Sequence, residues 1–236
     1  MSCDVVDLRD FYATNLGKLV YSQVLGLIQQ VWPSLPPGPF VALGYGVPYM
    51  NGLGQKDMFA FMPSYQGVLA WPHESPPLSV LVEEDQLPVS DRSIQNLLMM
   101  HFLENCHNPK RVLEEASRVL VNDGRILLIV PNRRGAWARV DQTPFGHGQP
   151  YTMTQACLLL RNNGFTPIRM LRGLYTLPSH NRLLQATSPL LERLGPCALQ
   201  KFSGIVCIEA TKEIYANVPA RSKSRGLRVL ERAKPA

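Results

Sequence analysis

Short apolar runs recur along most of the chain, and helical segments separate several of them. Few of these runs alternate strictly between apolar and polar side chains, which is typical of parallel strands buried on both faces. The runs are FVALG at 40–44, DMFAFM at 57–62, LSVLV at 78–82, IQNLLMM at 94–100, GRILLIV at 124–130, FTPIRML at 165–171 and GIVCIEAT at 204–211. Because strands and helices alternate, the pattern predicts an open, doubly wound α/β sheet.

A helical pattern precedes the first of these strands. Between Leu8 and Val31, apolar residues recur at steps of three and four, which predicts two helices that meet near Asn15 to Gly17. The stretch PSLPPGP at 33–39 ends this helical segment because proline interrupts helices.

Later helices have clear start signals. In NPKRVLEEASRVL, at 108–120, Asn108 can cap the helix and Pro109 suits its first position. The NDG sequence at 122–124 then predicts a turn into the next strand. Another helix is predicted in TMTQACLLLRNNGF, at 152–165, which opens with a capping box.

Composition and charge divide the chain into three parts. With 236 residues, of which 45% are hydrophobic and 18% charged, it suits one large globular α/β domain. The net charge of +6 is concentrated in residues 218–236, which hold six basic residues and one acid. We expect a helical segment over 1–36, an α/β domain over 37–217 and a basic, disordered tail over 218–236. The tail either keeps the chain soluble or contacts RNA, a membrane surface or an acidic partner.

Cysteine usage and the chain's beginning both favour a cytoplasmic protein. The five cysteines form no CxxC or CxxH pair, so the sequence predicts neither a metal site nor a disulfide framework. The first ten residues, MSCDVVDLRD, lack the features of a signal peptide. The aliphatic runs are too short to span a membrane.

The segment from Leu87 to Asn132 carries a more specific signal. It resembles the middle of a class I methyltransferase of the type-11 kind, which uses S-adenosylmethionine (SAM), and PNRRGAWARVDQTPFGHGQPYT at 131–152 resembles a bacterial branch of that family. The matching pieces are Leu87-Pro88, Asp91, His101, Leu103-Glu104, Arg118-Val119-Leu120 and Gly124. Over Phe40 to Thr211 the resemblance implies a seven-stranded, mostly parallel sheet whose last pair is antiparallel.

The resemblance implies a glycine turn that holds the amino-acid part of SAM after the first strand. Gly44 and Gly46 match the opening glycines of such a turn. Tyr45 between them is bulky, Pro48 stands at the third glycine, and Ala42 replaces a carboxylate that often precedes the turn. The turn is therefore a degenerate version of the family's motif.

The resemblance also implies two acids in the cofactor site, one after the second strand and one after the third. The acid that holds the ribose after the second strand is missing, because Pro63 and Ser64 stand there. The acid that faces adenine after the third strand is present as Glu83, with Glu84 beside it. We therefore expect SAM to be bound by Gly44, Gly46 and these two glutamates.

Two histidines are the catalytic candidates. His101 follows the fourth strand, where it can face the methyl group and the substrate or form a structural hydrogen bond at the sheet edge. His147 lies in TPFGHGQPYT, a glycine- and proline-rich stretch that can act as a lid or as a rigid connector. Either histidine can serve as a general base.

Four further residues are candidates for substrate binding. Arg133, Arg134 and Trp137 follow the fifth strand and can hold a phosphate or stack on a base, or else pack over the sheet end. Tyr151 lies at the end of the predicted lid. The sequence thus favours a SAM-dependent methyltransferase of unknown substrate. The alternative is a methyltransferase-fold protein without activity that binds RNA or another protein.

Overall fold

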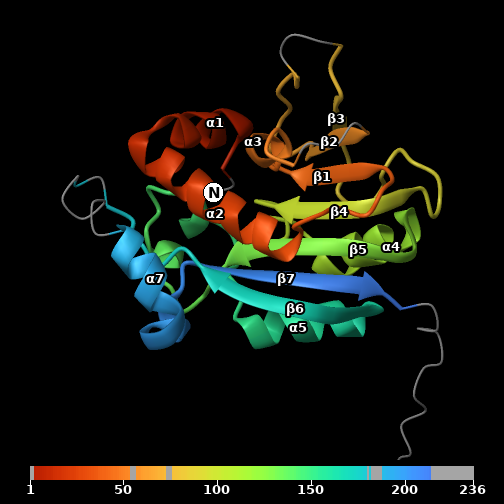
Figure 1. The fold of residues 1–236 in the computed structure, drawn as a ribbon. Helices are drawn as coiled ribbons and strands as arrows, with labels where there is room; N and C mark the ends of the chain where they lie inside the picture. The colour runs from red at the N-terminus through yellow and green to blue at the C-terminus, as the bar shows by residue number, and fades with distance from the viewer. Residues whose placement is uncertain (1–2, 54–56, 73–75, 180, 182–187, 214–236) are drawn as a thin grey trace, which may run out of the picture.

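A seven-stranded sheet forms the centre of the protein, with strand order β3-β2-β1-β4-β5-β7-β6 (Figure 1). The computed structural model describes residues 3–53, 57–72, 76–179, 181 and 188–213. The strands are β1 (Phe40–Gly44), β2 (Met58–Pro63), β3 (Ser79–Val82), β4 (Ile94–Met100), β5 (Leu120–Pro131), β6 (Phe165–Gly173) and β7 (Ile205–Lys212). The α-helices are α1 (Val5–Ala13), α2 (Asn15–Val31), α3 (Val47–Met50), α4 (Pro109–Val119), α5 (Met153–Asn162) and α7 (Ser188–Ala198). Short 3-10 helices are η1 (Trp137–Arg139), η2 (Pro144–Gly146) and η3 (Gln200–Phe202).

The directions of the strands agree with the predicted fold. β7 lies between β5 and β6 and is antiparallel to both, whereas the other neighbouring strands run parallel. This confirms the doubly wound, mostly parallel sheet and its antiparallel closing pair.

Helices cover both faces of the sheet. Phe40 and Ala42 of β1 pack into the core beneath α1 and α2, whereas Val41 and Leu43 pack into the core beneath α4 and α5. Figure 1 shows α2 crossing the front of the sheet, with α4 and α5 behind it. Burial on both faces explains why the sequences of β1, β4, β5 and β7 do not alternate between apolar and polar residues, whereas the edge strands β3 and β6 are partly exposed.

The two N-terminal helices meet where the sequence predicted. Asp4 caps α1 by accepting hydrogen bonds from the backbone N–H groups of Val6 and Asp7. Thr14 ends α1 and caps α2, because its side chain accepts a hydrogen bond from the Gly17 N–H. In Figure 1, α1 lies beyond the carboxyl ends of β1 and β4, where ligands bind in sheets of this kind.

Arg118 connects α4 to the chain that leads into β4. Its guanidinium donates at 2.6 Å to Glu115 on its own helix and at 2.6 Å to Asp91. It also donates to the carbonyl oxygens of Leu87 and Val89, at 3.1 and 3.0 Å. Two residues of the resemblance, Asp91 and Arg118, therefore hold this loop in place.

Glu115 makes stability depend on pH in the acid range. Burial alone favours its neutral form, but hydrogen bonds from Arg118 and from the Leu87 N–H outweigh burial and lower its pKa below the ordinary 4.5. A lowered carboxyl pKa stabilises the fold above 4.5, and this contribution is lost as pH falls through the folded-state value. We therefore expect the thermal midpoint to fall less on acidification in Glu115→Gln than in the wild type. Glu114→Gln, on the exposed side of α4, is the control, and equal slopes in all three proteins would contradict the prediction.

The predicted turn at 122–124 is wrong in detail. The residues lie inside β5, which already pairs with β4 at Ile94↔Leu120 and resumes at Asn96↔Arg125. The extra β5 residues form an irregularity in which Asp123 adopts a φ of 64°. The pattern of apolar residues also gave no signal for α3 or for α7.

The basic tail at 218–236 lies outside the described residues. Among the helices that the structure does describe, none combines the length and the hydropathy that crossing a membrane requires.

Candidate functional site

The glycine turn at the end of β1 is shaped by packing against β4. Gly44 has a φ of 90°, and a Cβ at this position would collide with the carbonyl oxygen of Met100. The Tyr45 N–H donates a hydrogen bond to the same oxygen at 2.9 Å. At Gly46, a Cβ would lie 2.7 Å from the Cβ of Ala42. Close packing, against the Met100 backbone at Gly44 and against the Ala42 side chain at Gly46, therefore accounts for both glycines without a ligand.

Three buried tyrosines lie against this turn: Tyr45 within it, Tyr49 in α3 and Tyr12 in α1. The rings of Tyr12 and Tyr45 stack with their centroids 5.7 Å apart. The Tyr49 hydroxyl donates to the Tyr12 hydroxyl at 2.9 Å. Burial raises the pKa of Tyr45 to about 12 and that of Tyr49 still higher, so the phenols are neutral at physiological pH.

The residues after β2 and β3 are those that the sequence implied: no acid follows β2, and two glutamates follow β3. Pro63 is buried at the end of β2, and the exposed Ser64 donates at 3.3 Å to Glu83 Oε2. Glu83 is itself exposed. Glu84 instead accepts a hydrogen bond from the His107 N–H at 3.0 Å. The two glutamates thus follow β3 as predicted, but they bind neighbouring loops.

The glycine turn and the position after β2 do not fit SAM in the arrangement that the resemblance implied. The three tyrosines take up the space beside the turn, and the residue after β2 offers no carboxylate for a ribose. We therefore assign no step of a reaction to a cofactor at this turn.

His101 is the centre of a buried polar chain. It directly follows β4, has a φ of 53° and is buried. Its Nε2 lies 2.9 Å from the Tyr12 hydroxyl, and its Nδ1 lies 3.7 Å from Glu104 Oε1. With Tyr49 bound to Tyr12, three side chains form a hydrogen-bonded chain that can hold and relay a proton, and Glu104 lies beyond hydrogen-bond distance of its end. The geometry corresponds to the predicted alternative of a hydrogen-bonded histidine at the sheet edge.

The residues after β5 divide between the surface and the core. Arg133 and Arg134 are exposed. Trp137 is buried, its Nε1 donates to the Thr176 carbonyl at 2.6 Å, and its ring meets Phe145 edge-on at 5.4 Å. The predicted pairing of two arginines with an accessible tryptophan is therefore absent here, because core packing holds the ring.

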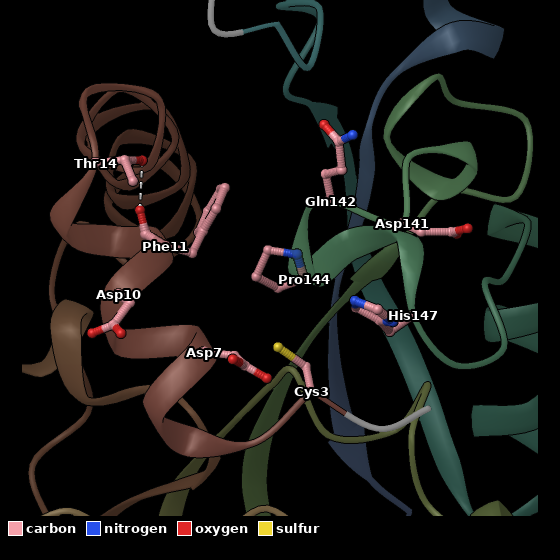
Figure 2. A pocket seen from close by; sticks show the side chains of 9 residues that line it. All are labelled: Cys3, Asp7, Asp10, Phe11, Thr14, Asp141, Gln142, Pro144 and His147. Atoms are coloured by element: carbon pink, nitrogen blue, oxygen red, sulfur yellow. Dashed lines mark hydrogen bonds between the residues drawn. The ribbon is translucent and has the colours of Figure 1, made fainter.

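His147 lines a cavity of about 450 Å³ between α1 and the segment at 141–147. Figure 2 shows residues of α1 on one side of this cavity and those of the segment on the other. The lining residues are Cys3, Asp7, Asp10, Phe11, Thr14, Asp141, Gln142, Pro144 and His147. Burial, with Asp7 and Asp4 nearby, raises the pKa of the Cys3 thiol to about 12, so this thiol is not a nucleophile at neutral pH.

Tyr151 lies beside the end of β5. It pairs with Asn132 directly after β5, and its N–H donates to the Pro131 carbonyl at 3.0 Å. It lines a second cavity, of about 410 Å³, together with Glu104. The segment that contains His147 and Tyr151 therefore borders two separate cavities.

The sequence interpretation missed several residues of this edge. The sequence placed Tyr12 in a predicted helix and Tyr49 just after the glycine turn. Nothing in their spacing indicated that their hydroxyls would meet. Glu104 belonged to the family resemblance but was not among the predicted site residues. Among the described residues, no group of three or more histidine, cysteine or acidic side chains could hold a metal ion.

Residues 54–128 match the model of a methyltransferase domain, which covers less than half of the chain. One curated protein, the uncharacterized protein YafS of Escherichia coli, is 38% identical over 52 residues. That match covers 22% of this chain and 22% of YafS, so the chain matches only about a fifth of this relative's length.

Solved structures of the same fold match over much more of the chain. A SAM-dependent methyltransferase of Thermotoga maritima has a TM-score of 0.66 at 17% identity, over 89% of this chain and 96% of that one. A methyltransferase of Mesorhizobium loti has a TM-score of 0.54 at 11% identity, over 79% and 96%. The [4+2]-cyclase SpnF has a TM-score of 0.53 at 16% identity, over 80% of each chain. At these identities the likeness shows the Rossmann-like methyltransferase fold.

Proposed function

We propose that this protein is a SAM-dependent methyltransferase with an acceptor that is not yet known. The observation that supports it best is the match of residues 54–128 to a methyltransferase domain, because this segment runs from β2 through most of β5. The strand order and the antiparallel β7 are consistent with it. Membership of the bacterial branch with the PNRRGAWAR sequence is part of the same proposal.

SAM would supply an activated methyl group, and the protein would position an acceptor against it. Because the predicted turn does not fit SAM, we propose that other residues of the carboxyl edge make the cofactor contacts. Within this proposal, His101 is a positioning residue that holds Tyr12 and faces Glu104. Arg133 and Arg134 are available to an anionic group of the acceptor. Binding of nucleic acid or of an acidic partner by the basic tail at 218–236 stays a prediction.

Calorimetry with SAM and S-adenosylhomocysteine tests the proposed function. We expect both ligands to bind, and at 100 times its dissociation constant a ligand should stabilise the fold by about 2.7 kcal/mol. Adenosine alone is the ligand control. Absence of heat and of thermal stabilisation at millimolar concentrations of both ligands would contradict the proposal.

The predicted adenine contact has a test of its own. Glu83→Gln should weaken SAM binding, whereas Glu114→Gln on the exposed side of α4 should leave it unchanged. Equal SAM affinities of the two variants would show that Glu83 does not contact SAM, and they would leave the proposed methyltransferase function standing.

A second candidate function is a methyltransferase-fold protein that does not methylate. The buried cluster of Tyr12, Tyr45 and Tyr49 favours it, because these side chains take up space at the turn. The likeness to SpnF, a cyclase, is consistent with other uses of this fold. Failure of both ligands to bind in the calorimetric test would favour this second function.

A further inference from the structure

Two segments of the chain meet where β5 ends and β7 begins. Pro131, the last residue of β5, pairs with Ile205, the first residue of β7, so residues 132–135 and 200–204 lie at the same edge of the sheet. This is the carboxyl edge, because β5 runs parallel to β4 and β4 runs parallel to β1. Ligands bind at this edge in sheets of this kind, so both segments lie where a partner can bind.

Asn132 joins the two segments. Its side-chain amide donates to the carbonyl oxygens of Lys201 and Ser203, at 3.3 and 2.9 Å. Its backbone N–H donates to the Gly204 carbonyl at 2.8 Å. A Cβ at Gly135 would lie only 2.3 Å from the Ser203 carbonyl oxygen, so the two backbones are in close contact. The two segments therefore form one fixed surface.

This surface carries three exposed cations, Arg133 and Arg134 on the first segment and Lys201 on the second. Within the part of the chain that the structure describes, no acidic side chain forms an ion pair with any of them. The sequence has no aspartate or glutamate at 132–139 or at 199–204. Cations that lie close together without acids attract an anionic partner, and arginine is well suited to binding phosphate groups.

An exposed aromatic ring lies next to these cations. Phe202 directly follows Lys201 and is 64% exposed, the highest value among the large hydrophobic side chains that the structure describes. The sequence had predicted that Trp137 is the aromatic partner of the two arginines, but Trp137 is buried. An exposed ring beside cations can stack on a nucleic-acid base. Phe202 therefore offers the stacking surface that Trp137 cannot.

This mixture of groups favours a single strand of nucleic acid over a lipid surface. A protein that docks on lipid buries a large apolar face in the bilayer boundary. At 132–139 and 199–204, which the structure describes throughout, only Phe202 and, at 36%, Leu199 expose a large apolar side chain. In a duplex the bases are stacked on one another, so a protein ring can stack on a base only where the strand is single.

We propose that the surface formed by Arg133, Arg134, Lys201 and Phe202 binds single-stranded nucleic acid. The three cations contact phosphates along the strand, and the Phe202 ring stacks on a base. This binding goes beyond the proposed methyl transfer and does not require SAM.

Fluorescence anisotropy tests the proposal with a labelled single-stranded RNA of about twelve nucleotides and the full-length protein. We expect the single strand to bind at least about fivefold more tightly than an RNA duplex of the same length, whose bases are not free to stack on Phe202. No binding of the single strand, or equal binding of the duplex, would overturn the proposal. Because SAM is absent from the titration, the result is independent of the proposed methyltransferase function.

Vesicles of phosphatidylserine and phosphatidylcholine test the lipid alternative. We expect the protein to bind the single-stranded RNA more tightly than these vesicles. Binding to the vesicles without binding to the RNA would overturn the proposal.

Phe202→Ala tests the stacking contact. Loss of one stacked base should weaken binding of the single strand at least about fivefold. The ring is exposed, so the melting temperature of the free protein should not change. Leu158→Ala is the matched control, because Leu158 is an apolar residue of α5 with 56% exposure, and it should bind like the wild type. Unchanged affinity in Phe202→Ala would overturn the proposal.

The salt dependence of binding tests the phosphate contacts. In a plot of log Kd against log salt concentration, three contacts with a single strand predict a slope of at least about 2. Combining Arg133→Gln with Arg134→Gln should lower this slope by about 1.4. Arg161→Gln, an exposed arginine of α5, is the control and should keep the wild-type slope. An unchanged slope in the double variant would show that cations elsewhere in the chain bind the strand, and it would overturn the proposal.

Discussion

Trp137→Ala is expected to destabilise the fold by about 3–5 kcal/mol, the usual cost of removing a large buried aromatic side chain. Trp137 is buried, and its indole lies between Phe145 and the backbone at Gly204. Its Nε1 also donates to the Thr176 carbonyl, which would lose its partner. Chemical denaturation followed by tryptophan fluorescence and circular dichroism measures the change, and the remaining tryptophans Trp32 and Trp71 keep the fluorescence signal.

The control for this variant is Trp137→Phe. Phenylalanine keeps an aromatic ring in the core and loses the indole hydrogen bond, so we expect a smaller loss of about 1–3 kcal/mol. An accessible tryptophan that only stacked on a substrate would show almost no stability change in either variant. A loss below about 1 kcal/mol for Trp137→Ala would therefore contradict the buried position.

Arg125→Met is expected to cost about 3 kcal/mol, because it leaves a buried carboxylate without its ion pair. The guanidinium of Arg125 donates to Glu209 Oε1 at 2.9 Å, and Glu209 is 2% exposed. The same oxygen accepts a hydrogen bond from Trp32 Nε1 at 3.0 Å, so Glu209 keeps one donor. This remaining bond places the expected loss at the lower end of the range for broken buried pairs.

Two further variants show whether the stability loss in Arg125→Met comes from the unpaired Glu209 carboxylate. Adding Glu209→Gln to Arg125→Met removes the charge and keeps an acceptor for Trp32, so most of the stability should return. Lys110→Met breaks an exposed pair with Glu114 and should cost less than about 0.5 kcal/mol. A similar small loss in Arg125→Met, or no recovery in the double variant, would contradict the interpretation.

Much of the fold could be predicted from local sequence. The capping residues Asn108 and Thr152 start their helices as expected, because a cap depends on a few neighbouring backbone groups. The strands were predicted because burial on both faces leaves a continuous apolar run. The irregularity at Asp123 was missed, since a short glycine turn and a bulge within a strand have similar residues.

The candidate site could be predicted only in part. The positions of Gly44 and Glu83 at the ends of β1 and β3 followed from the resemblance and the parallel strands. Their surroundings did not, because the tyrosine beside the turn comes from α1, far away in the chain. Glu104 gave no signal of its own, since an acid in a loop is normally solvated and its burial depends on the segment at 148–151.

The sequence by itself determined the alternation of strands and helices, the helix starts and the layers of the sheet, because these depend on short-range periodicity and local hydrogen bonds. Only the tertiary structure decided that Tyr12 lies against the glycine turn, that Trp137 belongs to the core and that Glu104 is buried without a hydrogen-bond donor. Each of these depends on contacts between segments that are distant in the chain, and such contacts leave no periodic pattern in either segment.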